Sequence, residues 1–244
     1  MDHGGRHCGK SFARLEAALS WLKEQRIGLI FNLGDAINGG DDHESEIRYA
    51  QTIAKAFASF PAEARFVIGN HDIELLSKEE YAAEIGGLNP GAFERSFERG
   101  GVRFIMLDGN MHGDGSDFFP AKFTWDKAYL GPKQLEWLHG ELSLAGGRPV
   151  IIMCHECLDY NIWDNALDPH IVRDVDSFRS IVNGFPNVLA VIHGHYHPGR
   201  SMVLDNLPYC AFTSVVAGEF PEPGAAAVVS VMPDGALDAS SRSS

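Results

Sequence analysis

Four short polar motifs, each following an apolar run, constrain the fold of this chain more than any other feature. The apolar runs are typical of buried strands and cover residues 29–33, 65–68, 150–153 and 188–192. The motifs that follow them are Gly34-Asp35, Gly69-Asn70-His71-Asp72, His155 and Gly194-His195-Tyr196-His197. Because parallel strands end at the same edge of a sheet, side chains that follow such strands converge in space. The sequence therefore predicts an α/β fold with one site at that edge.

The segments between these strands carry the periodicity of helices. Apolar residues spaced three and four apart predict helices over 12–25, 47–57, 78–84, 132–142 and 169–183. Further strands are predicted over 102–107 and, without helices between them, near 202–204, 209–213 and 226–232. Strand–helix alternation followed by a run of strands predicts layered sheets flanked by helices, in one domain over residues 1–239. Residues 240–244 are expected to form a disordered tail.

Charge and the distribution of apolar residues argue against two classes of partner. The net charge is -13 and Lys and Arg form no cluster, so no nucleic-acid partner is expected. No apolar run approaches the roughly 18 residues needed to span a bilayer, so no membrane partner is expected. The cysteines fit free thiols in a reducing compartment, which favours a cytoplasmic location. Cys154 and Cys157 have the spacing of a redox or zinc motif, but no second pair accompanies them.

The polar motifs supply a ligand set for divalent metals. Asp35 can bridge two cations, and Asn70 offers a carbonyl oxygen. His155 and His195 offer ring nitrogens, and this mixture of donors suits Mn, Fe, Zn, Ni or Co better than Ca or Mg. Each motif alone also fits a turn, a helix cap or a buried histidine, but their order after successive strands favours the metal site. Two metals about 3.5–4 Å apart activate water for in-line displacement at phosphorus.

His71 and Asp72 are the candidate catalytic residues. His71 is expected to point to the open face of the site, where it stabilises phosphoryl charge or protonates a leaving alkoxide. Asp72 is expected to accept a hydrogen bond from the His71 ring and so fix its tautomer. Gly34, Gly69 and Gly194 are expected to allow the sharp backbone turns that direct the ligands into the site.

Together the motifs resemble those of the calcineurin-like metallophosphoesterases. The resemblance rests on the four motifs above and spans most of the chain. It implies a four-layer α/β/β/α sandwich and two divalent transition metals. It also implies that Asp35 bridges the metals and that His197 binds the first metal. The second metal would be bound by Asn70, His155 and His195.

Part of the chain is similar to a narrower group, the manganese-dependent ADP-ribose/CDP-alcohol diphosphatases. The similar segments are Ser11 to Leu15 with Trp21, residues 107–110 and residues 130–138. This similarity implies cleavage of phosphoanhydrides in nucleotide-linked small molecules. The long aperiodic segment 109–131 carries aromatic residues that either stack on a nucleobase or pack the loop: Phe118, Phe119, Phe123 and Trp125.

Other residues near the motifs have weaker claims to the site. Glu156 is adjacent to His155 in sequence but is not expected to be a ligand, and His193 is expected to be buried at its strand end. Tyr160, Trp163 and Asp164 follow His155 and are expected to shape the pocket. The remaining histidines are expected to be surface or capping residues: His3, His7, His43, His112, His139 and His170.

Three functions remain open at this point. The first is a two-metal hydrolase of a small nucleotide-linked phosphodiester or pyrophosphate. The second is a phosphomonoesterase, including a protein phosphatase. The third is a catalytically impaired metal-binding scaffold of the same fold, against which His71 and Asp72 argue, because a scaffold has no use for them. The sequence gives neither the native metal nor the oligomeric state.

The chain departs from the family pattern at its start. The family begins with a strand that ends in Asp-x-His or Asp-x-Gln, and both residues bind the first metal. Only ten residues precede the helix that begins at Ser11, and Asp2 and His3 are not expected to substitute as ligands. The first metal site is therefore expected to be incomplete in this chain, with Asp35 and His197 as its ligands.

We predict that Met1 is an internal start and that the intact protein carries roughly 15 or more further residues that include this strand. Without the strand, we expect an apolar trough and unpaired backbone groups, each costing about 1–3 kcal/mol if buried. Reading the coding sequence upstream of Met1 tests this, followed by comparison of stability and metal content of the two proteins. A nearby upstream stop codon, with cooperative folding and two metals bound by the 244-residue protein, would contradict it.

Overall fold

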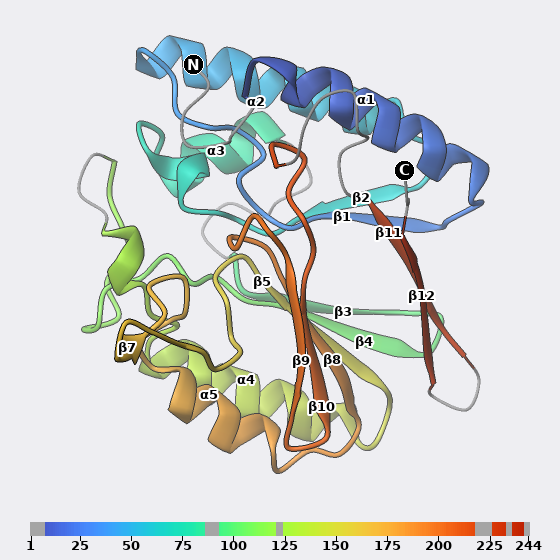
Figure 1. Cartoon of the computed structure of the whole chain (residues 1–244), viewed down its shortest axis with the longest axis vertical. Coiled ribbons are helices and arrows are strands. Elements are labelled where there is room, and N and C mark those ends of the chain that lie inside the picture. Colours follow the sequence, from blue (N-terminus) through green and yellow to red (C-terminus); the bar gives the residue numbers. More distant parts are fainter. Residues whose placement is uncertain (1–7, 86–92, 121–123, 218–225, 233–235, 242–244) are drawn as a thin grey trace.

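Two sheets stacked between two groups of helices form the structure, a computed structural model that describes residues 8–85, 93–120, 124–217, 226–232 and 236–241 (Figure 1). The helices α1 (Cys8–Glu24), α2 (His43–Ala58) and α3 (Lys78–Ile85) lie over a small parallel sheet. That sheet consists of β1 (Leu29–Asn32) and β2 (Glu63–Phe66). The helices α4 (Pro132–Ala145) and α5 (Val175–Val182) cover the far face of the second sheet. These layers confirm the predicted α/β/β/α sandwich.

The second sheet has six strands in the order β3-β4-β5-β8-β10-β9. Their bounds are Arg95–Arg99, Val102–Met106, Val150–Cys154, Val188–His193, Leu207–Ala211 and Arg200–Leu204. The four central strands β4, β5, β8 and β10 are parallel, and the edge strands β3 and β9 are antiparallel to their neighbours. Every residue of β5 is buried, as expected of a parallel strand with both faces covered.

Aromatic and aliphatic side chains hold the two sheets together. The ring of Phe31 on β1 lies 5.5 Å from that of Phe104 on β4, measured between ring centroids. Val67, Ile151 and Met153 belong to the same buried cluster. This contact brings the carboxyl ends of β1 and β2 close to those of β5 and β8.

Local sequence signals explain how the loops after β1 and β2 are held together. Asp42 caps α2 by accepting a hydrogen bond from the backbone N–H of Ser45 at 2.8 Å. Glu46, in the first turn of α2, is fully buried and accepts from the N–H groups of Gly40 and Leu75. One carboxylate therefore ties the loop after β1 to the loop after β2.

Several sequence predictions need correction. The helix predicted over 169–183 begins only at Val175, because Cys157 forms backbone hydrogen bonds with His170 and Val172. The tail predicted from residue 240 is wrong for Ser240 and Ser241, which belong to β12 (Leu237–Ser241) and pair with β11 (Ala227–Val231). The single-domain boundary stays a prediction.

The sequence analysis also missed several short elements. Besides β3 and β12, these are β6 (Ile162–Trp163), β7 (Ala166–Leu167), and the 3-10 turns η1 (His71–Ile73) and η2 (Trp125–Lys127). None of the helices among the described residues combines the length and the apolar character that crossing a bilayer requires.

An apolar cavity of about 570 Å³ lies between β1 and β11. Within the described ranges, each of these strands pairs along one edge only, β1 with β2 and β11 with β12. Phe31, Phe104 and Met153 line the middle of the cavity, and its polar end reaches Asp35 and His155. The upstream strand and the trough that its absence would leave stay predictions.

Candidate metal centre

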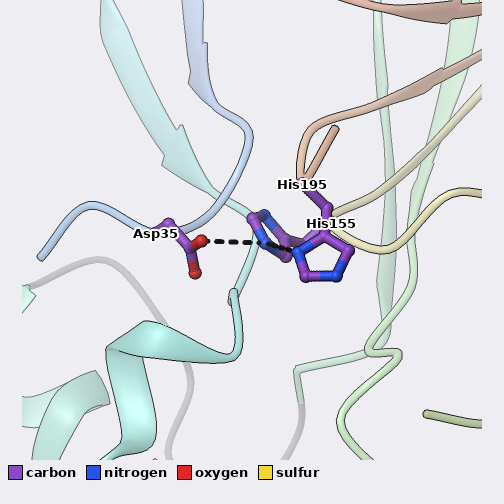
Figure 2. A group of neighbouring side chains, drawn as sticks. All are labelled: Asp35, His155 and His195. Carbon is purple, nitrogen blue, oxygen red and sulfur yellow. Dashed lines mark hydrogen bonds and ion pairs between the residues drawn. The ribbon is translucent and has the colours of Figure 1, made fainter. Parts of the chain in front are cut away.

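Three side chains from three different strand ends meet at the polar end of the cavity (Figure 2). Asp35 follows β1, His155 follows β5 and His195 follows β8, and their ligand atoms all lie within 4.8 Å of one another. Nε2 of His155 is 3.2 Å from Oδ2 of Asp35 and 3.1 Å from Nδ1 of His195. Parallel strands with a common exit edge produce this convergence, as the sequence predicted.

The unsatisfied polar atoms of this cluster fit a bound metal. Among the described residues, Oδ1 of Asn70 is buried without a hydrogen-bond partner, and Oδ2 of Asp35 has no hydrogen-bond partner besides its contact with Nε2 of His155. A buried acceptor without a partner is costly, and a cation bound by Asp35 and Asn70 would satisfy it. Nδ1 of His155 donates to the carbonyl oxygen of Leu33 at 2.7 Å, which directs Nε2 into the cluster.

Two of the candidate ligands are held in a backbone conformation that L-residues rarely adopt. Asp35 has φ of 51° and His195 has φ of 60°, both in the left-handed region. Such strain collects at functional sites, where the surrounding structure enforces it. Gly69 allows the close approach that holds Asp35, because a Cβ at position 69 would lie 2.3 Å from both N and Oδ1 of Asp35.

Asp72 holds this strained turn in place. Its fully buried carboxylate accepts from the backbone N–H groups of Asp35 at 3.0 Å, Ile37 at 3.2 Å and Gly69 at 2.8 Å. The expectation that Asp72 orients the His71 ring is therefore corrected: its oxygens are occupied by the backbone. Asp72 positions the loop that presents Asp35.

The His71 ring instead contacts Glu74. Its Nδ1 is in hydrogen-bond contact with Oε1 of Glu74, three residues further along the chain. The backbone N–H of His71 donates to Oδ1 of Asp35 at 2.9 Å, which places His71 beside the cluster. The sequence analysis missed Glu74, although residues i and i+3 of a 3-10 turn lie on the same face.

The remaining candidates divide into those near the cluster and those away from it. His197 lines the adjoining cavity and lies outside the group of three. Glu156 is buried beneath Gly109, and burial raises its pKa to about 7, but its carboxylate is not part of the cluster. His193 is fully buried, as expected.

A second group of potential ligands lies deeper in the protein. Ligand atoms of Cys157, Asp159 and His193 also lie within 4.8 Å of one another. Both carboxylate oxygens of Asp159, however, accept from the guanidinium group of Arg200 at 2.8 Å. Because the positive charge of Arg200 is adjacent and already satisfies the Asp159 carboxylate, a cation is disfavoured at this second group.

Aromatic residues frame one side of the cluster. His170 was expected at the surface, but it is half-buried. Its ring centroid lies 5.0 Å from that of His195. The ring of Trp125 lies 5.7 Å from His195 and is 41% exposed. Phe118 is buried in the core, whereas Phe119 is exposed, and Phe123 lies outside the described residues.

The residues after His155 differ in their exposure. Tyr160 and Trp163 are both exposed, Trp163 on the short strand β6. Asp164 follows at the turn between β6 and β7, with φ of 52°. Their expected role in shaping a pocket stays a prediction.

Electrostatic coupling inside the cluster is strong. Burial opposes ionisation of Asp35, but the neighbouring His155 imidazole outweighs burial and holds the pKa of Asp35 well below its usual range. Burial likewise lowers the pKa of His155, but the Asp35 carboxylate outweighs it and raises that pKa to about 10. Burial and then the positive charge of His155 lower the pKa of His195. The metal-free cluster therefore holds a proton on His155.

The fold and the cluster define a metallophosphoesterase, and a family comparison agrees. The model of the family described as calcineurin-like phosphoesterase matches residues 3–199. The chain belongs to the calcineurin-like phosphoesterase family.

Two curated proteins show distant similarity to the chain. It is 26% identical over 151 residues to the 3',5'-cyclic adenosine monophosphate phosphodiesterase CpdA of Escherichia coli. The matched region covers 60% of this chain and 48% of that protein. It is 21% identical over 221 residues to the manganese-dependent ADP-ribose/CDP-alcohol diphosphatase of Arabidopsis thaliana, covering 77% and 70%. The chain thus spans about half the length of the first relative.

Two solved structures share the fold. A dimetal phosphatase from Danio rerio superposes with a TM-score of 0.66 at 17% identity, covering 88% of this chain and 81% of that chain. TT1561 of Thermus thermophilus superposes with a TM-score of 0.58 at 12% identity, covering 94% and 92%. At these identities the likeness supports the fold alone.

We predict that Gly69→Ala weakens metal binding by about 10- to 100-fold, the range found when the support of a ligand is disturbed. The added Cβ would collide with Asp35 and displace its carboxylate. Gly140→Ala on α4 is the matched control, since nothing lies within 4 Å of its added Cβ. Isothermal titration with Mn²⁺ measures both variants, and equal affinities would contradict the prediction.

Metal binding should also release a proton. At neutral pH the metal-free His155 ring is charged, because its pKa is raised to about 10, and the ring must become neutral to bind a metal. The apparent affinity should therefore rise about tenfold per pH unit for each proton released, as pH rises towards that pKa. Titrations at pH 7 in buffers of different ionisation enthalpy count the protons. A count of zero would show that His155 is already neutral or is not a ligand.

Proposed function

We propose that the protein hydrolyses a phosphoester or phosphoanhydride bond of a small nucleotide-linked substrate, with two divalent transition metals activating the attacking water. The observation that carries the proposal is the convergence of Asp35, His155 and His195, whose ligand atoms lie within 4.8 Å of one another. The partnerless buried oxygen of Asn70, next in sequence to His71, supports it, because a buried acceptor of this kind calls for a partner such as a cation.

The ligands divide between two metal positions. Asp35, Asn70, His155 and His195 would hold one metal, and Asp35 with His197 would contribute to the other. Bound metals would lower the pKa of water and stabilise the charge that develops on the phosphoryl oxygens. The mixed nitrogen and oxygen donors favour Mn, Fe, Zn, Ni or Co.

His71 acts as the general acid in this proposal. Its backbone is tied to Asp35, so its ring lies at the edge of the metal cluster. As the bond between phosphorus and the leaving oxygen breaks, His71 donates a proton to that oxygen, which leaves as an alcohol or a phosphate. Asp72 supports the step indirectly, because it fixes the loop that carries Asp35.

Two observations favour a nucleotide-linked substrate. The half-exposed ring of Trp125 stands next to His195, where it offers a flat surface to a base. The names of the two curated relatives both denote cleavage of nucleotide-linked phosphodiester or diphosphate bonds. Comparing bis-p-nitrophenyl phosphate with p-nitrophenyl phosphate separates a diesterase from a monoesterase, and a faster monoester reaction would favour the latter.

Hydrolysis should require a transition metal, and Asp35→Asn should reduce it the most. One bridging carboxylate serves both metals, so its loss should cost several kcal/mol of transition-state stabilisation, about 100-fold or more in kcat/KM. Asp176→Asn, on the exposed face of α5, is the matched control. The measurement pairs hydrolysis rates with metal content after chelation and after Mn²⁺ is restored. Full activity of rigorously metal-free protein would overturn the proposal.

His71→Ala should keep its metals and lose about 10²-fold in kcat. The loss should shrink for substrates with good leaving groups, because these depart without a proton. His43→Ala, whose side chain is partly exposed on α2, is the control. Rates for a series of leaving groups, measured with metal content, test the role. Loss of metal in step with activity would make His71 a ligand instead of an acid.

A further inference from the structure

The carboxylate of Glu74 occupies a place that the fold has shaped for it. We propose that Glu74 is the positioning residue of His71: it holds Nδ1 of the ring and thereby directs Nε2 to the leaving oxygen of the substrate. This inference rests on the proposed function, in which His71 is the general acid. In this proposal Glu74 acts through His71 alone.

The contact follows from local geometry. His71 begins the turn η1 and Glu74 is the residue that ends it, with φ of -65° and ψ of -44°. Residues three apart in such a turn are eclipsed, so their side chains meet. Oε1 of Glu74 is in hydrogen-bond contact with Nδ1 of His71. The side chains are 21% and 30% exposed, so solvent screens the contact less than it would a surface pair.

The loop after β1 leaves room for the second oxygen of this carboxylate. A Cβ at position 39 would lie 2.2 Å from Oε2 of Glu74, and Gly39 has φ of +47°. A side chain at Gly39 would therefore both strain the backbone and displace Glu74. The absence of a Cβ at this point is consistent with a loop shaped around the carboxylate.

Glu46 fixes the backbone on both sides of the contact. Its Oε1 accepts from the N–H of Gly40, next to Gly39, at 3.1 Å. Its Oε2 accepts from the N–H of Leu75, next to Glu74, at 3.0 Å. One fully buried residue thus ties the loop that carries Glu74 to the loop that carries Gly39, which makes the position of Glu74 a property of the fold.

The chemistry of the general acid explains what this position achieves. Nδ1 and Nε2 lie on opposite sides of the imidazole ring, so a partner at Nδ1 turns Nε2 away from Glu74. When Nε2 gives its proton to the leaving oxygen, the ring becomes neutral and its remaining proton stays on Nδ1, facing Glu74. Water then returns a proton to Nε2 before the next turnover. Without Glu74 the ring loses this fixed orientation and tautomer.

Two variants test the proposal independently. Glu74→Ala removes the carboxylate, and Gly39→Ala displaces it while leaving Glu74 in the chain. Glu79→Ala, an exposed glutamate of α3, is the matched control. We expect both test variants to lose about 10- to 100-fold in kcat on an alkyl phosphodiester, the range for residues that orient a functional ligand. KM and metal content should stay unchanged, and nitrophenyl substrates should be affected less.

A spectroscopic measurement separates orientation from general damage. In protein labelled with ¹⁵N at histidine and loaded with metal, the neutral His71 ring should carry its proton on Nδ1. In Glu74→Ala it should shift towards the Nε2–H tautomer, while Glu79→Ala should keep the native pattern. An unchanged tautomer in Glu74→Ala would overturn the proposal.

The kinetic outcomes distinguish this inference from the proposed function. If His71→Ala loses activity on the alkyl substrate and Glu74→Ala does not, the inference fails and the proposed function stands. If Glu74→Ala loses metal, Glu74 is a ligand and the inference also fails. If His71→Ala loses nothing on either substrate class, the assignment of the general acid fails, and the inference fails with it.

Discussion

A single buried carboxylate, that of Asp72, determines where the metal centre can form. It accepts three backbone N–H groups, two from the loop after β1 and one from the exit of β2. Removing this acceptor would leave buried donors unsatisfied at about 1–3 kcal/mol each. These bonds hold Asp35 in its left-handed conformation and turn its side chain towards the second sheet. The position of Asp35 is therefore a consequence of backbone hydrogen bonding.

The second half of the centre comes from the other sheet, and one hydrogen bond connects the halves. Nδ1 of His155, at the end of β5, donates to the carbonyl oxygen of Leu33, at the end of β1. This bond joins the two layers at their carboxyl edges and also selects the nitrogen that faces the cluster. The contact of Phe31 with Phe104 fixes the distance between the same layers further along the strands. Packing, tautomer and ligand geometry thus depend on one another across the sandwich.

The sequence predicted the strands that precede the candidate ligands and the convergence of Asp35, His155 and His195, because buried strands and their polar exits leave a clear one-dimensional pattern. It could not predict the partner of His71. Asp72 is adjacent in sequence, but its oxygens accept from backbone groups, two of them in the loop after β1. The turn η1 brings Glu74 into reach instead. The helix expected over 169–183 was overestimated for a similar reason, since long-range bonds to Cys157 hold its first residues in another conformation. No pattern in the sequence places His170 beside His195, because their proximity depends on the path of the loop that contains His170.

The central claim is that one divalent metal binds between the two sheets through Asp35, Asn70, His155 and His195. Crystals of the protein grown with Mn²⁺ and measured at the manganese absorption edge test it directly. The account predicts an anomalous difference peak bonded to carboxylate and amide oxygens from Asp35 and Asn70 and to ring nitrogens from His155 and His195. A fully ordered cluster without such a peak, or a peak among Cys157, Asp159 and His193 in its place, would contradict the account.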